Sequence, residues 1–304
     1  MLAIIISLLI IQTSADVGTT GFNFLKITPS AKEAAMAGAT IGLESNYSLS
    51  GFGFLYNPAA TAKNSVIGAG YLDYVADIGI GVIGYSKQSP LSFLKSGGIG
   101  ISYLNSGKIK RTDINGSELG TFSVSYLNLN VTGNVSLASE LNAGLGLKIL
   151  YGSIDSFLGI GLASDLGIRY QPAIKGLTLG AVIKNLGYQI KAFDQERDNL
   201  PIDIGIGAGY DLSDNVNLAL DIHKPIDNTI LFNLGVEGWV HKYVALRGGY
   251  NSLGQDYRTG GAADITSGLS VGLGVKYSKY QVDYSFTPMG DLGRLHHITL
   301  LFTL

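Results

Sequence analysis

The sequence of 304 residues contains no cysteine, only four histidines and few charged residues. The absence of cysteine excludes disulfides, thiolate metal ligands and cysteine nucleophiles. Charged residues make up 14% of the chain, against roughly 25% in soluble domains. The formal net charge is −2, and the densest basic group is Lys108, Lys110 and Arg111. This composition does not suit a soluble enzyme and gives no electrostatic basis for binding nucleic acid.

Catalytic and metal-binding motifs are also missing. No Ser-His-Asp order, paired-carboxylate motif or phosphate-binding loop stands out in the sequence. His223, on an inward strand face, and His296-His297, at the start of the last strand, lack the spacing of convergent metal ligands. Glycine repeats such as Gly79-x-Gly81 lie within strand patterns rather than before a helix. We therefore predict a non-enzymatic protein without a metal or another cofactor.

Long hydrophobic runs are absent too. The apolar run from Leu2 to Ile11 is shorter than the about 20 residues that a spanning helix needs. Small residues follow it up to Ala15, which predicts a signal peptide over 1–15 with cleavage after Ala15. The usual basic start is missing, since Lys26 is the first Lys or Arg. A buried N-terminal strand is the alternative interpretation.

What the sequence does contain is glycine, tyrosine and a hydrophobic period of two. There are 42 glycines and 17 tyrosines. Between Glu140 and Gly152, apolar side chains fall on one face, while small and polar ones fall on the other. The apolar face is Leu141, Ala143, Leu145, Leu147, Ile149 and Tyr151, and the opposite face is Asn142, Gly144, Gly146 and Lys148. Such alternation predicts strands with one apolar face.

The same pattern recurs from residue 63 to the end of the chain and predicts about fourteen strands, an even number that suits a closed antiparallel barrel. Their centres are Gly70, Gly81, Ile101, Val131, Leu145, Ser164, Gly180, Ile206, Leu220, Leu234, Leu246, Gly272, Tyr284 and Leu300. Long connections follow odd-numbered strands at 105–122, 187–200, 252–267 and 288–295. Short connections follow even-numbered strands at 212–215, 240–242 and 278–279, whereas the first hairpin and 87–96 break this parity.

Two further features favour a membrane barrel over a soluble β-sandwich or lipocalin. The polar strand faces consist largely of glycine, which makes a poor solvent surface. Tyrosines such as Tyr103, Tyr170 and Tyr277 end the apolar faces, as in the aromatic girdle of a membrane barrel. We therefore predict an all-β fold, a transmembrane antiparallel β-barrel over 63–304, located in the bacterial outer membrane among its lipids.

The region 16–62 precedes the first strand and is predicted to plug the barrel as a hatch. Ser30-x-x-Glu33 is a capping-box pattern, so a thin helix of small residues should run from Ala31 to Ala39. We expect this helix to face the inward glycines Gly144, Gly161 and Gly207. Asn57-Pro58 should end the hatch, because Pro58 interrupts strand pairing. The predicted hatch or gating residues are Ser30, Glu33, Met36, Gly38, Asn57 and Pro58. An external arm is the alternative.

Charged residues on the inward strand faces are nearly balanced in sign. They are Lys148, Asp165, Arg169, Lys184, Asp203, Asp221, Glu237, Arg247, Lys276 and Asp283. A buried charge is costly unless it is paired or hydrated. We expect cross-strand ion pairs that hold the hatch, with a ligand-facing network as the alternative.

The N-terminal region resembles the hatch of FadL-like outer-membrane proteins, and within that group the PorV/PorQ family. The matching residues are Phe24-Leu25, Ala31-Lys32, Met36-Ala37-Gly38-Ala39 and Asn57-Pro58-Ala59. The chain departs from the family in having Lys32 in place of a frequent Arg, and Ala35-Met36-Ala37-Gly38 in place of Gly-Met-Gly-Gly.

The PorV/PorQ resemblance implies a part in type IX protein secretion, with the translocon, a surface sortase and exported cargo as partners. The wider FadL-like resemblance implies hatch-gated uptake of long-chain fatty acids or other hydrophobic compounds. A barrel with a purely structural role is the third possibility.

Overall fold

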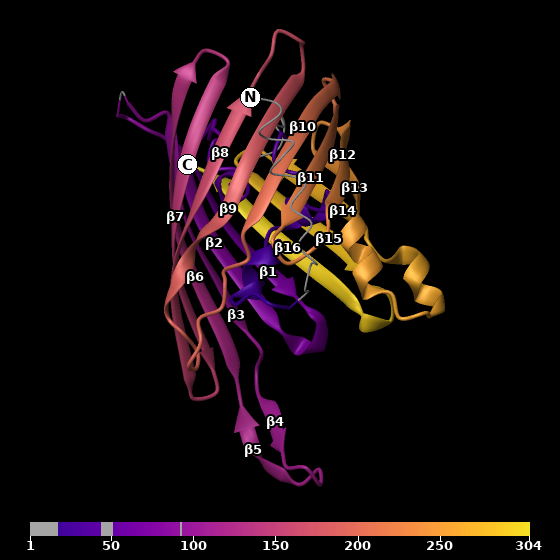
Figure 1. The fold of residues 1–304 in the computed structure, drawn as a ribbon. Coiled ribbons are helices and arrows are strands. Elements are labelled where there is room, and N and C mark those ends of the chain that lie inside the picture. The colour runs from indigo at the N-terminus through magenta and orange to yellow at the C-terminus, as the bar shows by residue number, and fades with distance from the viewer. Residues whose placement is uncertain (1–17, 44–50, 92) are drawn as a thin grey trace.

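A computed structural model describes residues 18–43, 51–91 and 93–304, so the predicted signal peptide lies outside the described residues. Fourteen antiparallel strands form one closed barrel in which each strand pairs with its neighbours along the chain (Figure 1). The barrel closes between the first and last strands, from Val66↔Thr303 to Asp73↔His296. All fourteen predicted strand centres lie in separate strands, and the barrel prediction is confirmed.

The barrel strands are β1 (Val66–Asp73), β2 (Gly79–Gln88), β3 (Ser96–Asn105), β6 (Val124–Ala138), β7 (Leu141–Ile154), β8 (Phe157–Tyr170), β9 (Leu177–Lys191), β10 (Asp203–Ser213), β11 (Val216–Pro225), β12 (Leu231–His241), β13 (Val244–Asn251), β14 (Leu269–Tyr277), β15 (Tyr280–Pro288) and β16 (Arg294–Thr303). The short helices are η1 (Asn23–Lys26), α2 (Ala31–Ala35), η2 (Gly53–Leu55), η3 (Val75–Asp77), η4 (Ser252–Tyr257), η5 (Ala262–Thr266) and η6 (Gly290–Leu292). Among the described residues, no helix is both long and apolar enough to cross a membrane.

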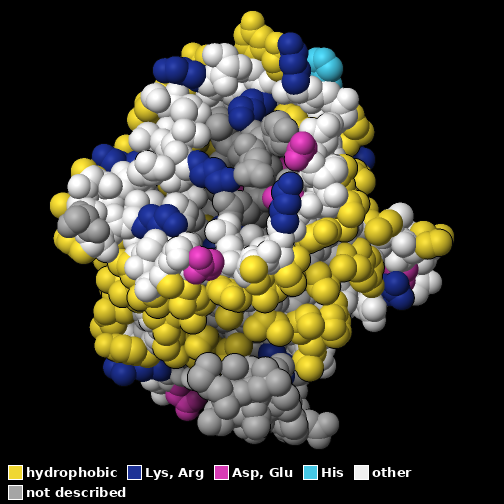
Figure 2. All heavy atoms as spheres, turned by 90° about the horizontal axis from the view of Figure 1, so that it is seen from above, with side chains coloured by type: hydrophobic (Ala, Val, Ile, Leu, Met, Phe, Trp, Pro, Cys, Tyr) yellow, Lys and Arg dark blue, Asp and Glu magenta, His cyan; other side chains and the backbone are white. Residues whose placement is uncertain are grey.

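The outer wall is apolar because the strands alternate as predicted. In β7, Leu145, Leu147 and Ile149 are 46%, 58% and 54% exposed, while Lys148 between them is buried. Hydrophobic side chains cover the flank of the barrel that Figure 2 shows. A soluble protein would bury this face, so the alternation places the wall in lipid. The chain is an outer-membrane barrel.

The two ends of the barrel differ in their connections. At the turn end, which carries the start of β1 and the end of β16, β10–β11, β12–β13 and β14–β15 are joined by turns at 214–215, 242–243 and 278–279. At the loop end, the connections include 106–123, 192–202 and 252–268. Long loops are typical of the cell exterior and short turns of the periplasmic side. The loop parity fails at β7–β8, where residues 155–156 alone join two long strands at the loop end.

The connection 106–123 holds a hairpin that the sequence analysis missed. Strands β4 (Ile109–Thr112) and β5 (Glu118–Phe122) form a separate two-stranded sheet that projects beyond the barrel at the lower end of Figure 1. An ion pair between Arg111 and Asp155 ties the hairpin to the β7–β8 turn. The basic residues of this stretch were expected in an irregular loop, because their apolar alternation is too short to indicate strands.

Replacing Leu145 with Arg tests the lipid-facing wall. Leu145 lies at the predicted centre of its strand, whereas Leu137 lies near the turn end of β6, and both face outward. We expect Leu145→Arg to lower the free energy of unfolding in lipid bilayers by about 2–4 kcal/mol and Leu137→Arg by about 0–1 kcal/mol. Urea unfolding followed by heat-modifiable gel mobility measures both. Equal effects at the two depths would contradict a membrane-embedded wall.

Candidate functional site

The N-terminal segment, residues 18–43 and 51–65, lies inside the barrel (Figure 1). Phe22, Met36, Ile41 and Phe52 are at most 2% exposed although little of the segment is regular structure. A parallel bridge between Thr20 and Asn199 joins its start to the β9–β10 connection. The segment therefore contacts the inner wall near both of its ends and in its middle.

Helix α2 begins at Ala31, as expected, but the predicted capping box does not form. Ser30 makes no side-chain hydrogen bond to the helix backbone. Its hydroxyl instead donates to the Glu33 carboxylate and contacts the Tyr56 hydroxyl. The first helical N–H, that of Ala31, donates to Thr299 Oγ1 of β16 at 2.9 Å. The barrel wall thus takes over part of the capping role.

The helix ends at Ala35, so the prediction that it reaches Ala39 is wrong. Ala37 and Gly38 have φ values of 53° and 80°, in the left-handed region. The Gly38 N–H donates to the Glu33 carbonyl at 2.9 Å and closes the helix end. A run of small residues indicates a helix, but it does not show where the chain reverses; Gly38 permits the reversal here.

The expected contact of this helix with Gly144, Gly161 and Gly207 is also wrong. Helix α2 packs against β13–β16, and a Cβ added at Gly272 would lie 2.4 Å from Ala35 Cβ. Met36 and Ala37 lie against Gly235 and Gly249 in the same way. Glycine is required there because any side chain would collide with the segment. The period-two pattern identifies inward glycines but not which of them the helix meets.

Two of those predicted glycines lie beside other parts of the N-terminal segment, and the nearest neighbours of the third lie in the barrel wall. A Cβ at Gly144 would lie 2.2 Å from the Pro58 carbonyl, and one at Gly207 would lie 2.8 Å from Ile41 Cβ. Gly161 faces Leu150 of the neighbouring strand. The close approaches therefore extend over much of the barrel's circumference.

Asn57 and Pro58 form the turn that leads to β1. Asn57 Oδ1 accepts from the Ala59 N–H at 2.9 Å, and its Nδ2 donates to the Ile41 carbonyl at 2.9 Å. Asn134 of β6 donates to the carbonyls of Pro58 and Ala60 at 3.3 and 2.9 Å. Local side-chain bonds of this kind satisfy backbone groups that no strand can pair.

The predicted lumen charges form separate groups. In the first, Arg247 Nε lies 2.7 Å from Glu237 Oε2, and its Nη1 lies 2.7 Å from Asp283 Oδ1. All three side chains are fully buried. In the second group, Lys148 Nζ lies 2.6 Å from Asp165 Oδ2 and donates to Asn185 Oδ1 at 2.7 Å.

Other predicted charges contact the N-terminal segment. Asp221 Oδ2 accepts from the N–H groups of Thr40 and Ile41 at 2.6 and 2.9 Å. Arg169 donates to the Leu43 carbonyl. These hydrogen bonds satisfy backbone groups in the irregular stretch that follows α2. Lys276 is half-buried near the turn end, whose mouth is ringed by Lys and Arg in Figure 2.

The loop end carries contacts that the sequence analysis missed. The Lys26 ammonium pairs with Asp227 Oδ2, which also accepts from Thr20 Oγ1 at 2.6 Å. Asp227 is buried although it lies in the β11–β12 connection. Strand periodicity assigns a face only to strand residues, so an inward loop carboxylate leaves no signal in the sequence.

A hydrophobic cavity of about 870 Å³, here called the vestibule, lies at the loop end. Its lining includes Phe22, Phe24, Tyr126, Phe193 and Tyr257. The rings of Phe24 and Tyr126 stack at 5.0 Å, and Phe22 and Phe193 approach to 5.3 Å. Burial raises the pKa of Tyr257, and the Tyr257 phenol stays neutral near pH 7. The vestibule is therefore a mainly apolar, aromatic surface suited to apolar rings or chains.

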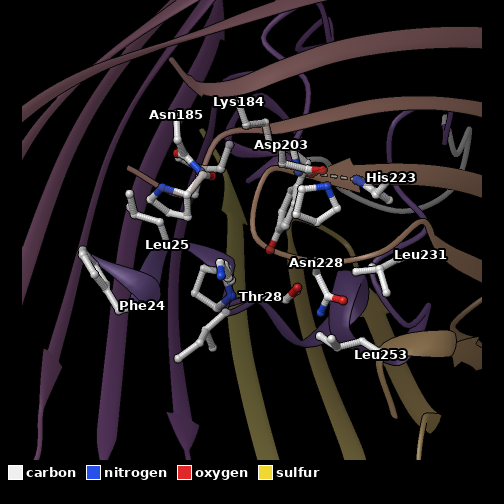
Figure 3. A pocket seen from close by; sticks show the side chains of 18 of the residues that line it. Phe24, Leu25, Thr28, Lys184, Asn185, Asp203, His223, Asn228, Leu231 and Leu253 are labelled. Carbon is white, nitrogen blue, oxygen red and sulfur yellow. Dashed lines mark hydrogen bonds and ion pairs between the residues drawn. The ribbon is translucent and has the colours of Figure 1, made fainter. Parts of the chain in front are cut away.

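A smaller cavity of about 200 Å³, the inner pocket, is shown in Figure 3 and shares lining residues with the vestibule. Phe24, Lys26 and Asn228 line both cavities. Deeper in the inner pocket, His223 Nδ1 lies 2.7 Å from Asp203 Oδ2 (Figure 3). Among the described residues, no group of His, Cys, Asp or Glu is arranged to hold a metal ion.

No family model matches the sequence, and no curated protein matches it. Solved structures of outer-membrane barrels share its fold. The toluene transporter TodX of Pseudomonas putida has a TM-score of 0.61 at 11% identity, covering 96% of this chain and 99% of that chain. The toluene transporter TbuX of Ralstonia pickettii has a TM-score of 0.58 at 11% identity, covering 88% and 96%. A FadL homologue of Pseudomonas aeruginosa has a TM-score of 0.60 at 10% identity, covering 91% and 98%. The chain thus has the fold of FadL-like barrels.

The buried charge group around Arg247 predicts a large stability effect. Replacing Arg247 with Met leaves Glu237 and Asp283 buried without their cation, and breaking such a group costs about 3–5 kcal/mol. Lys110→Met breaks the exposed pair with Glu118 and should cost about 0–1 kcal/mol. Urea unfolding of both variants measures the difference. If Arg247→Met were no more costly than Lys110→Met, the group would not stabilise the barrel.

Proposed function

We propose that this barrel carries hydrophobic small molecules across the outer membrane and that the N-terminal segment is its hatch. The observation that carries the proposal is the aromatic vestibule at the loop end, which adjoins an inner pocket bordered by the N-terminal segment. An apolar solute from outside would enter the vestibule and gain by burying its surface there. The toluene transporters that share the fold support this assignment.

The hatch has to move for passage, because it packs directly on the wall. Ala35 and Met36 lie against inward glycines, and Asn57 and Pro58 lie against Gly167 and Gly144. We assign Ser30, Glu33, Met36, Gly38, Asn57 and Pro58 to this hatch. In this assignment Gly38 allows the reversal after α2, and Asn57-Pro58 anchors the hatch at β1. Two charged residues of the lumen, Asp221 and Arg169, hold the hatch by hydrogen bonds to its backbone.

A role in type IX protein secretion is the second candidate. It rests on the resemblance of the N-terminal motifs to PorV/PorQ proteins, and the structural neighbours support the transport hypothesis better. Secretion would require stable protein partners. Affinity capture of the tagged barrel from outer membranes, with a β4–β5 hairpin deletion as control, tests it. Recovery of a translocon, sortase or cargo would favour secretion, and their absence would remove this candidate.

Solute uptake is the direct test of transport. Expression in cells that lack their own hydrophobic-compound transporters should raise the uptake of labelled toluene or oleate several-fold. Phe24→Glu should abolish the gain, because a carboxylate would stand between the vestibule and the inner pocket. Leu292→Glu, on an exposed loop, is the matched control. No gain with the unaltered barrel, at verified membrane levels, would refute the proposal.

Ala35→Trp tests the hatch. The indole would collide with Gly272, and overpacking costs about 1–3 kcal/mol, which should loosen the hatch. We expect higher single-channel conductance and faster proteolysis within residues 18–65. Ala262→Trp, on the exposed η5 loop, should change neither. Unchanged conductance and protease resistance in Ala35→Trp would show that displacing α2 opens no path.

A further inference from the structure

The inner pocket presents hydrogen-bond acceptors that have no donors among the described residues. Asp227 Oδ2 bonds Lys26 and Thr20, but its Oδ1 has no such partner, and Asp227 is only 2% exposed. Asp203 Oδ2 bonds His223, and again Oδ1 is left without one. A carboxylate oxygen can only accept, so each of these atoms requires a donor from whatever occupies the pocket.

Two more side chains of the inner pocket add acceptors. Asn128 Oδ1 and Asn233 Oδ1 are buried and have no donor within the described chain. His223 adds none, because its Nδ1 lies 2.7 Å from Asp203 Oδ2 and its Nε2 faces Asp221 Oδ2 at 3.8 Å. All the unpaired acceptor atoms belong to residues of one cavity wall.

The charges around the pocket are balanced. Lys26 pairs with Asp227, and Lys148 pairs with Asp165. Lys184, which also lines the pocket, is the cross-strand neighbour of Asp203. The ammonium groups of these three lysines offset the carboxylates beside them, so the pocket offers no net counter-charge to an anionic or a cationic head group. The arrangement therefore favours a neutral group that donates hydrogen bonds.

From this juxtaposition we propose that the barrel's ligand is a neutral aromatic compound with a hydroxyl group. Its ring lies among Phe22, Phe24 and Phe193 in the vestibule, and its hydroxyl donates to the acceptors of the inner pocket. The proposal rests on the transport function and narrows its substrate class. A hydrocarbon fills the vestibule equally well but leaves the buried acceptors unpaired, which is unfavourable.

Four probes with the same carbon skeleton separate the head groups: toluene, benzyl alcohol, benzoate and benzylammonium. Calorimetric titration of the purified full chain in detergent measures their affinities. We expect benzyl alcohol to bind about tenfold more tightly than toluene, which corresponds to one or two net hydrogen bonds. It should also bind more tightly than either ion. A purely apolar site reverses the order of alcohol and hydrocarbon, because the hydroxyl loses its water without replacement.

Asn128→Leu and Asn233→Leu should each remove most of the preference for the alcohol over toluene while leaving toluene binding unchanged. Asn130→Leu, two residues along the same strand and outside both cavity linings, is the matched control and should keep the preference. Heat-modifiable gel mobility verifies that each variant folds. If only one of the two pocket variants folds, that variant alone is enough for the test.

The outcomes distinguish failure of the hydroxyl assignment alone from failure of the transport site as well. Toluene binding as tightly as benzyl alcohol overturns the hydroxyl assignment and leaves hydrophobic transport standing. Tighter binding of benzoate or benzylammonium also overturns it, in favour of a charged head group. Failure of all four probes to bind counts against the hydroxyl assignment and against the vestibule as a transport site. An alcohol preference that survives in both folded pocket variants shows that these acceptors do not recognise the hydroxyl.

Discussion

The backbone's need for hydrogen bonds inside a bilayer is the constraint on which this structure depends. Lipid offers no partner to an N–H or C=O group, so spanning strands must pair on both sides and the sheet must close. Here β1 pairs with β16, and no barrel strand keeps an open edge along that seam. Closure has a second consequence. Side chains just fill a barrel of about eight strands, and a wider one encloses free space. The N-terminal segment occupies much of this space.

The irregular backbone inside the lumen has the same need for hydrogen-bond partners. Such a backbone is tolerated at membrane depth only where protein or water satisfies it. The wall supplies those partners: Thr299 for the Ala31 N–H, Asp221 for Thr40 and Ile41, and Asn134 for the carbonyls of Pro58 and Ala60. The inward glycines let backbone approach backbone closely enough for these bonds. The polar, glycine-rich inner face and the apolar outer face therefore follow from one requirement.

The inner face divides along the barrel axis by function. Away from the inner pocket, charged side chains pair with each other, as Arg247 does with Glu237 and Asp283, or with the N-terminal segment, as Asp221 does with Thr40 and Ile41. Near the loop end, the wall is aromatic, and several acceptors of the inner pocket have no partner among the described residues. The segment's fixation and the proposed recognition of a solute thus use the same chemistry at different depths. Asp227 belongs to both, because its Oδ2 pairs with Lys26 of the N-terminal segment and the residue also lines the inner pocket.

By itself the sequence determined the strands, their number, the faces they turn to lipid and lumen, and the start of the helix at Ala31. These are local properties, since alternation over a few residues decides which face is apolar. Only the tertiary structure decided which glycines meet Ala35 and Met36, which charges pair, and where α2 ends. Those depend on how the segment is rotated within the lumen, and no periodicity records that angle. Asp227, Phe193 and the β4–β5 hairpin belong to connections, where inward and outward have no meaning until the barrel closes.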